Sequence, residues 1–202
     1  MEIKNIIFDY GGVLLYWDPH FVYDEYFKNK EKANWFLENV CTYQWNAQND
    51  AGKPIAEGTA ELIAKFPEWE KEIRMYYDEF EDMIWEMNGM EVMTWVLKVY
   101  GYHVFGLTNW SAETFARIRH KYHVFDLMED MVISGEEHIT KPDPRIFDIA
   151  IKRFGVKPEE TIFVDDNLAN VETAKSLGFN VIHFKTKDEF IHEIERLTGR
   201  EI

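Results

Sequence analysis

The chain has little of what marks an exported, membrane-bound or nucleic-acid-binding protein. Its one cysteine, Cys41, excludes an internal disulfide framework and disfavours a zinc cluster. It has 22 basic residues against 37 acidic ones, and the net charge of −15 disfavours binding to a nucleic-acid backbone. No run approaches the roughly 18 apolar residues of a membrane span, and no basic stretch precedes the first apolar run. We therefore expect a cytoplasmic protein with neither a membrane nor a nucleic acid as partner.

Hydrophobic residues make up 46% of the 202 residues, which is enough for one full core with a smaller module attached. From residue 18 to residue 87 aromatic residues recur at intervals of three and four, as on amphipathic helices, without a clear strand pattern. This stretch holds 16 acidic and 7 basic residues, so most of the excess negative charge lies here. We predict a helical insert at 18–87 within a core formed by 1–17 and 88–202.

The insert contains one polar stretch, Trp45–Pro54, with glycine and proline near its end. We interpret it as the insert's one long loop, and ligand contacts tend to lie on loops. Tyr16 and Trp17 lie where the chain should enter the insert, and their rings either line a sugar site or pack the hinge. The candidate contacts in the loop, by position only, are Trp45, Asn46, Gln48, Asn49 and Asp50.

The rest of the chain alternates short apolar runs with helical segments. Helical crossovers of about ten residues between strands give right-handed connections and a parallel sheet. The predicted fold class is α/β, with a doubly wound, Rossmann-like parallel sheet as the core and an inserted helical cap. Strands are expected at Ile3–Phe8, Tyr102–Leu107, Met131–Ser134, Thr161–Val164 and Val181–Phe184, with Ser111, Asp143 and Thr186 as helix caps and Gly101, Gly155 and Gly178 as helix ends.

Polar residues follow three of these strands and precede one helix. The carboxyl ends of parallel strands meet at one edge of the sheet, where open α/β sheets bind ligands. Two adjacent carboxylates after a buried strand repel each other unless a cation or hydrogen bonds hold them. The candidates are Asp9 after the first strand, Thr108 and Asn109 after the second, Lys141 before the helix at Pro144, and Asp165 and Asp166 after the fourth.

Four stretches in this order resemble the haloacid dehalogenase-like hydrolase superfamily, which consists mostly of magnesium-dependent phosphatases. They are Phe8-Asp9-Tyr10-Gly11-Gly12-Val13-Leu14, Leu107-Thr108-Asn109, Lys141-Pro142-Asp143-Pro144 and Val164-Asp165-Asp166-Asn167. The resemblance covers nearly the whole chain. It implies a phosphatase with a helical cap of the C1 type, acting on a small phosphorylated metabolite, and it leaves the oligomeric state open.

The resemblance also implies a role for each site residue. Asp9 would be the nucleophile and form an aspartyl phosphate. Thr108 and Lys141 would be catalytic and, with Asn109, would bind the phosphate. Asp9, Asp166 and the backbone carbonyl of Gly11 would be ligands of Mg²⁺, with Asp165 as a further ligand or an orienting neighbour.

One position departs from the family pattern. Most phosphatases of the superfamily have a second aspartate two residues after the nucleophile, which protonates the leaving alcohol, and here that position is Gly11. A branch with Asp-x-Gly-Gly or Asp-x-Gly-Asn, which includes bacterial phosphatases acting on glucose 1-phosphate, is the most similar. Two alternatives stay open: a binding or regulatory protein with little turnover, which Gly11 favours, and a 2-haloacid dehalogenase, for which the insert offers only Arg74 to hold a substrate carboxylate.

Overall fold

A computed structural model describes residues 2–202 and contains the predicted parallel sheet. Its five strands are ordered β5-β4-β1-β6-β7, and every neighbouring pair is parallel. The chain visits β4 and β5 on one side of β1 and β6 and β7 on the other, so the strand order reverses beside β1. The strands span Asn5–Phe8 (β1), His103–Thr108 (β4), Met131–Ile133 (β5), Thr161–Asp165 (β6) and Asn180–His183 (β7). The predicted α/β fold is confirmed.

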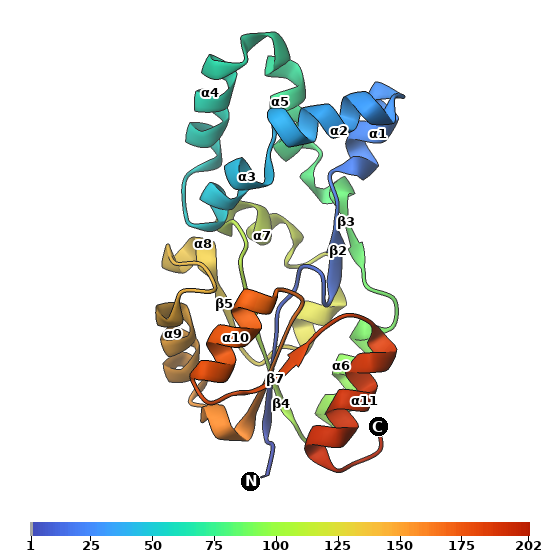
Figure 1. The fold of residues 1–202 in the computed structure, drawn as a ribbon, viewed down its shortest axis with the longest axis vertical. Helices are drawn as coiled ribbons and strands as arrows, with labels where there is room; N and C mark the ends of the chain where they lie inside the picture. Colours follow the sequence, from blue (N-terminus) through green and yellow to red (C-terminus); the bar gives the residue numbers. More distant parts are fainter. Residues whose placement is uncertain (1) are drawn as a thin grey trace.

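Alternate side chains of the buried strands pack against helices on opposite faces of the sheet. Ile6 and Phe8 belong to the same core cluster as residues of α6 and α11, whereas Ile7 joins the cluster that includes α9 and α10. Figure 1 shows these two helix pairs on either side of the strands. The helices of this part are α6 (Met90–Val99), α7 (Ala112–Ile118), α8 (Ser134–Glu137), α9 (Pro144–Phe154), α10 (Leu168–Ser176) and α11 (Lys187–Thr198), with 3₁₀ turns at His123–Leu127 and Pro158–Glu160.

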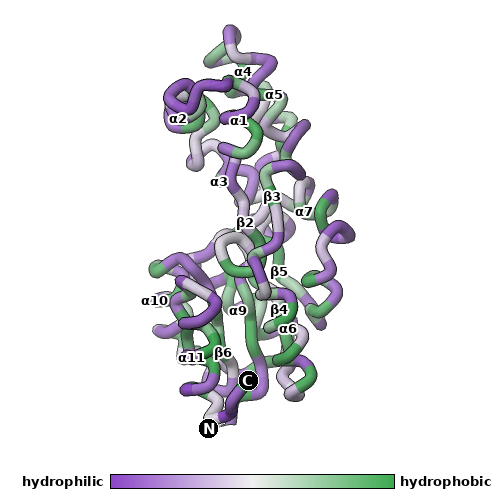
Figure 2. The backbone as a smooth tube through the Cα atoms, turned by 90° about the vertical axis from the view of Figure 1, so that its right-hand side faces the viewer, coloured by the Kyte–Doolittle hydropathy of each residue, from purple (hydrophilic) through white to green (hydrophobic). Residues whose placement is uncertain are grey.

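The segment between β2 and β3 is helical, as its aromatic spacing predicts. Its helices gather beyond one end of the sheet (Figure 1), around a core that includes Tyr23, Phe36 and Tyr76. Figure 2 shows that α2 is largely hydrophilic and that hydrophobic stretches concentrate along the strands of the sheet. These helices are α1 (His20–Phe27), α2 (Lys30–Asn39), α3 (Tyr43–Asp50), α4 (Ile55–Lys65) and α5 (Glu70–Asp78), with 3₁₀ turns at Pro67–Trp69 and Phe80–Met83.

Two expectations for the insert are wrong. Trp45–Pro54 is not one long loop, because Tyr43–Asp50 forms helix α3, which starts where the Thr42 hydroxyl accepts a hydrogen bond from the Trp45 amide. A strand also occurs where none is predicted: β3 (Ile84–Glu86) pairs antiparallel with β2 (Leu15–Trp17). Three residues are too few for a periodic signal, and the partner strand is distant in sequence. The chain enters and leaves the insert through this ribbon; the division at 17/18 and 87/88 stays a prediction.

Most predicted helix ends are confirmed. The Asp143 side chain accepts from the Arg145 amide, the Thr186 hydroxyl accepts from the Glu189 amide, and Gly155 ends α9 in the left-handed conformation. Ser111 stands at the N-cap position of α7, but its side chain makes no capping hydrogen bond. No helix among residues 2–202 has both the length and the apolar character to cross a bilayer.

Gly106 tests how tightly β4 packs against β1 and the residues that follow it. It lies opposite Phe8 in the neighbouring strand, and a Cβ at Gly106 would overlap the buried Tyr10 ring. We expect Gly106→Ala to lower the free energy of unfolding by about 1–3 kcal/mol in urea titrations. Gly58→Ala is the matched control: its nearest neighbour would be the Asn49 amide at 3.4 Å, and alanine stabilises a helix interior by up to about 1 kcal/mol. Equal effects of the two substitutions would contradict the packing argument.

Candidate active site

Asp9 lies at the carboxyl end of the central strand. Its amide donates to the Val164 carbonyl at 2.9 Å, which holds it beside the end of β6, and its Oδ1 accepts from the Tyr10 amide at 2.7 Å. The residue is only 8% exposed. Gly12 follows in the left-handed conformation (φ 73°), and a side chain there would overlap the Asp166 carboxylate, so glycine lets the loop approach Asp166.

Lys141 is a buried ammonium group between two carboxylates. Its Nζ lies 2.9 Å from Asp9 Oδ1 and 2.7 Å from Asp165 Oδ2, and it donates to the Leu107 carbonyl at 2.8 Å. Asn109 holds the backbone of this lysine from both sides: its Nδ2 donates to the Lys141 carbonyl at 2.9 Å, and its Oδ1 accepts from the Lys141 amide at 2.8 Å. Asn109 therefore positions Lys141, a function that the sequence does not reveal. Its role in substrate binding stays a prediction.

Asp165 and Asp166 differ sharply in their surroundings. Asp165 is fully buried and accepts hydrogen bonds from the Lys141 ammonium, from the Asn170 amide group at 3.0 Å and from the Asn167 backbone at 2.8 Å. Asp166 is exposed and forms no ion pair among the described residues. The protein's own donors occupy Asp165, whereas Asp166 is open to a ligand. Carboxylate oxygens of Asp9, Asp165 and Asp166 lie within 4.8 Å of one another, as in a cation site.

The concentrated negative charge changes the acidity of the cluster. Burial raises the pKa of Asp9 to about 7; Lys141 opposes the shift, and Asp165 and Asp166 add to it. Although Asp166 is exposed, its carboxylate is partly shielded from water, and this shielding, followed by the charge of Asp165, raises its pKa. For Lys141, burial alone would lower the pKa, but Asp165 and Asp9 outweigh it and raise the pKa above its ordinary value. A further cation beside Asp9 and Asp166 would keep both carboxylates ionised.

Thr108 is at the end of β4, the strand adjacent to β1. The residue is 1% exposed, and its hydroxyl is one of few buried polar side-chain atoms in residues 2–202 without a hydrogen-bond partner. An unpaired buried hydroxyl costs about 1–3 kcal/mol. Thr108 precedes Asn109, which lines the pocket, but does not itself line it.

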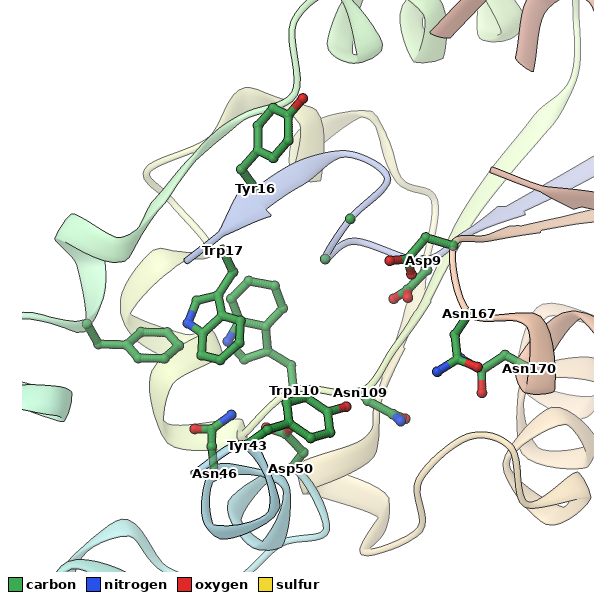
Figure 3. Close-up of a pocket in the computed structure, with 14 residues that line it drawn as sticks. Asp9, Tyr16, Trp17, Tyr43, Asn46, Asp50, Asn109, Trp110, Asn167 and Asn170 are labelled. Carbon is green, nitrogen blue, oxygen red and sulfur yellow. The ribbon is translucent and has the colours of Figure 1, made fainter. Parts of the chain in front are cut away.

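A pocket of about 410 Å³ opens beside Asp9 between the sheet and the insert (Figure 3). Of the five predicted loop contacts only Asn46 and Asp50 line it; Trp45 and Asn49 are buried within the insert, and Gln48 is exposed. Tyr43, Phe80 and Trp110 also line the pocket and are not predicted from the sequence. The spacing of Tyr43, Asn46 and Asp50 fits one face of a helix and is the signal that could have identified Tyr43. The lining residues are Asp9, Gly11, Gly12, Tyr16, Trp17, Tyr43, Asn46, Asp50, Phe80, Asn109, Trp110, Asp166, Asn167 and Asn170.

Two other expectations concern the pocket wall and Arg74. Tyr16 and Trp17 both line the pocket, and the Tyr16 ring packs against Trp85 of β3 with centroids 5.6 Å apart, which favours the hinge-packing interpretation. Arg74 binds Glu70 within its own helix and is absent from the pocket lining, so it offers no anchor for a haloacid carboxylate there.

A family model of haloacid dehalogenase-like hydrolases matches residues 3–178, and the chain belongs to this family. The sesquiterpene phosphatase astK of Aspergillus oryzae is 27% identical over 197 residues, 97% of each chain. D-ribitol-5-phosphate phosphatase of Bacteroides thetaiotaomicron is 27% identical over 88% of this chain and 89% of its own. A magnesium complex of a haloacid dehalogenase family enzyme from the same bacterium superposes with a TM-score of 0.74 at 21% identity, covering 96% of this chain and 99% of that one.

These findings confirm the predicted family. They also bear out the predicted enzyme class, a phosphoric monoester hydrolase, because these two relatives match over most of their length and are phosphatases.

The raised pKa of Asp9 makes the stability of the metal-free protein depend on pH. An unfolded aspartate ionises near pH 4, so between about pH 5 and 6.5 the unfolded chain has lost a proton that folded Asp9 retains. Stability should therefore fall as pH rises through this window, by about 1.4 kcal/mol per pH unit for each such carboxyl group. In urea titrations with chelator, Asp9→Asn should remove the contribution of one proton, about 1.4 kcal/mol per pH unit, from the pH dependence of the free energy of unfolding. Asp188→Asn, which removes an exposed carboxylate on α11, should keep the wild-type slope; an unchanged Asp9→Asn slope would contradict the burial argument.

Proposed function

We propose that this protein is a Mg²⁺-dependent phosphatase that hydrolyses a small phosphomonoester of an uncharged alcohol, such as a sugar phosphate, through an aspartyl phosphate on Asp9. The observation that carries the proposal is the cluster at the ends of β1 and β6. Lys141 Nζ lies within 2.9 Å of Asp9 and within 2.7 Å of Asp165, and Asp166 is open beside them. A carboxylate nucleophile, a fixed cation and a free carboxylate are the groups that phosphoryl transfer from a monoester requires.

The roles of the chain's own residues follow from their contacts. Lys141 orients the Asp9 carboxylate through Oδ1, which leaves Oδ2 free to attack phosphorus in line with the leaving oxygen. The Thr108 hydroxyl donates to an equatorial phosphate oxygen, where negative charge builds in the transition state. Asp165 keeps Lys141 in place, and Asn109 fixes the backbone of that lysine.

The carboxylate cluster fits a hard divalent cation. Asp9, Asp166 and the Gly11 carbonyl would hold Mg²⁺. Asp165 would act mainly as an orienting neighbour, because three protein donors already make four hydrogen bonds to its side chain. A bound magnesium ion would offset the charge of the phosphate beside these carboxylates. Burial, with the charge of neighbouring carboxylates, raises the pKa of Asp9 and Asp166, and a divalent cation beside them would favour their ionised forms.

The pocket lining supports a neutral leaving group. Aromatic and amide side chains make up most of the wall, and no lysine or arginine is among its residues. A second anionic group on the substrate would find no partner there, whereas a polyol can stack on aromatic rings and bond to amides such as that of Asn46. The name of the relative D-ribitol-5-phosphate phosphatase gives it a substrate of this kind, the phosphate ester of a polyol.

A phosphatase assay tests this function. We expect wild type to release phosphate from 4-nitrophenyl phosphate and from some members of a sugar-phosphate panel, with Mg²⁺ and not with chelator. Asp9→Asn should lower kcat/KM at least about 10³-fold because the nucleophile is lost, while Asp188→Asn should match wild type. No turnover on any ester would favour the binding-protein alternative, and metal-independent halide release from a 2-haloacid would favour a dehalogenase.

The two adjacent aspartates should respond differently to substitution. Asp166→Asn should raise the Mg²⁺ concentration for half-maximal activity by at least about 10-fold without loss of stability, because the Asp166 side chain forms no ion pair within residues 2–202. Asp165→Asn should lower the free energy of unfolding by about 3 kcal/mol, because it removes one partner of a buried ion pair. Magnesium titrations and urea unfolding of both variants measure these effects. A loss of stability in Asp166→Asn together with a weaker Mg²⁺ dependence only in Asp165→Asn would overturn this division of roles.

A further inference from the structure

The pocket lacks a proton donor at the usual place beside the nucleophile. Gly11 has no side chain, and a Cβ built there would meet no atom within 4 Å, so the space that an acid would fill is open. The leaving oxygen of a phosphate attacked in line by Asp9 lies on the far side of phosphorus, toward the insert. Any residue that protonates it must therefore come from the insert's wall of the pocket.

Tyr43 presents a hydroxyl to this region. It is the first residue of α3, and Figure 3 shows its ring reaching into the pocket with the hydroxyl toward the side where Asp9, Asn109 and Asn167 lie. The residue is 64% exposed. Partial burial, followed by the carboxylates of Asp50, Asp9 and Asp166, raises its pKa, and Lys141 opposes the shift. The hydroxyl is thus within electrostatic range of the nucleophile cluster and keeps its proton at neutral pH.

Asp50 is the other acid on the insert's side of the pocket, and its position is less suitable. Burial raises its pKa to about 7 against the effect of the Ser111 backbone amide, and the catalytic carboxylates are not among the causes of the shift. Its carbonyl accepts a hydrogen bond from the Ser134 hydroxyl at 2.6 Å, which attaches the end of α3 to the sheet domain. Asp50 therefore joins the insert to α7 and α8, whereas Tyr43 faces the phosphate site.

Resting on the proposed function, we infer that Tyr43 is the general acid and base of this enzyme, in place of the aspartate that Gly11 replaces. As the Asp9 oxygen bonds to phosphorus and the ester P–O bond breaks, the Tyr43 hydroxyl gives its proton to the leaving alkoxide. The tyrosinate then takes a proton from the water that attacks the aspartyl phosphate. Phosphate leaves, and Asp9 and Tyr43 return to their starting states.

The test is the dependence of rate on the leaving group. The substrates are 4-nitrophenyl phosphate, phenyl phosphate and glycerol 2-phosphate, whose leaving groups need protonation increasingly. We expect Tyr43→Phe, which keeps the ring, to lower kcat on the alkyl ester by on the order of 10²-fold and to change the 4-nitrophenyl rate by less than about 3-fold. Tyr100→Phe is the control, because Tyr100 is an exposed tyrosine directly after α6 and is not among the residues that line the pocket; it should leave all three rates near those of wild type.

The outcomes separate this inference from the proposed function. If wild type hydrolyses none of the three esters, the proposed function fails and the inference with it. If wild type is active and Tyr43→Phe changes all three rates equally or not at all, only the inference is overturned. A leaving-group effect in Asp50→Asn but not in Tyr43→Phe would also overturn it and would assign the proton to Asp50.

Discussion

The buried bridge from Asp9 through Lys141 to Asp165 determines how the rest of the site is built. An ammonium group with no exposure is costly unless carboxylates and carbonyls surround it, and here two aspartates and the Leu107 carbonyl do so. The three side chains come from the ends of β1 and β6 and from the turn before α9. Closing the bridge therefore requires the parallel register in which Phe8 lies opposite Val164.

The same cluster has more negative than positive charge. One lysine serves three carboxylates, and burial together with the neighbouring carboxylates raises the pKa of Asp9 and of Asp166. The folded protein tolerates the repulsion among these carboxylates because the packing of β1 on both faces holds the strand ends in place. A divalent cation, as proposed above, would supply positive charge beside these carboxylates, and its binding would stabilise the folded protein.

More of the sheet and its helices than of the insert could be predicted from the sequence, for physical reasons. The strands of the sheet are buried apolar runs, and their polar ends line up once the sheet is parallel, so Asp9, Thr108, Lys141 and Asp165 could be placed at one edge without coordinates. Helix α3 was misjudged because its polar residues are poor helix formers, and packing of Trp45 and Asn49 inside the insert outweighs that preference. The partners of Asn109 and Asp165 could not be predicted, because side-chain contacts across the fold leave no periodic signal.

The helical structure of Tyr43–Asp50 affects the chemistry that the pocket can support. A flexible loop would offer Asn46 and Asp50 as loosely placed contacts, whereas a helix presents Tyr43, Asn46 and Asp50 on one face at fixed spacing. The helix is capped by Thr42 at one end and attached to the sheet domain through Ser134 at the other. If Asp9 is the nucleophile as proposed, a rigid helix would hold the Tyr43 hydroxyl in a fixed position for proton transfer. Gly11 leaves open space beside Asp9, because a Cβ there would meet no atom within 4 Å.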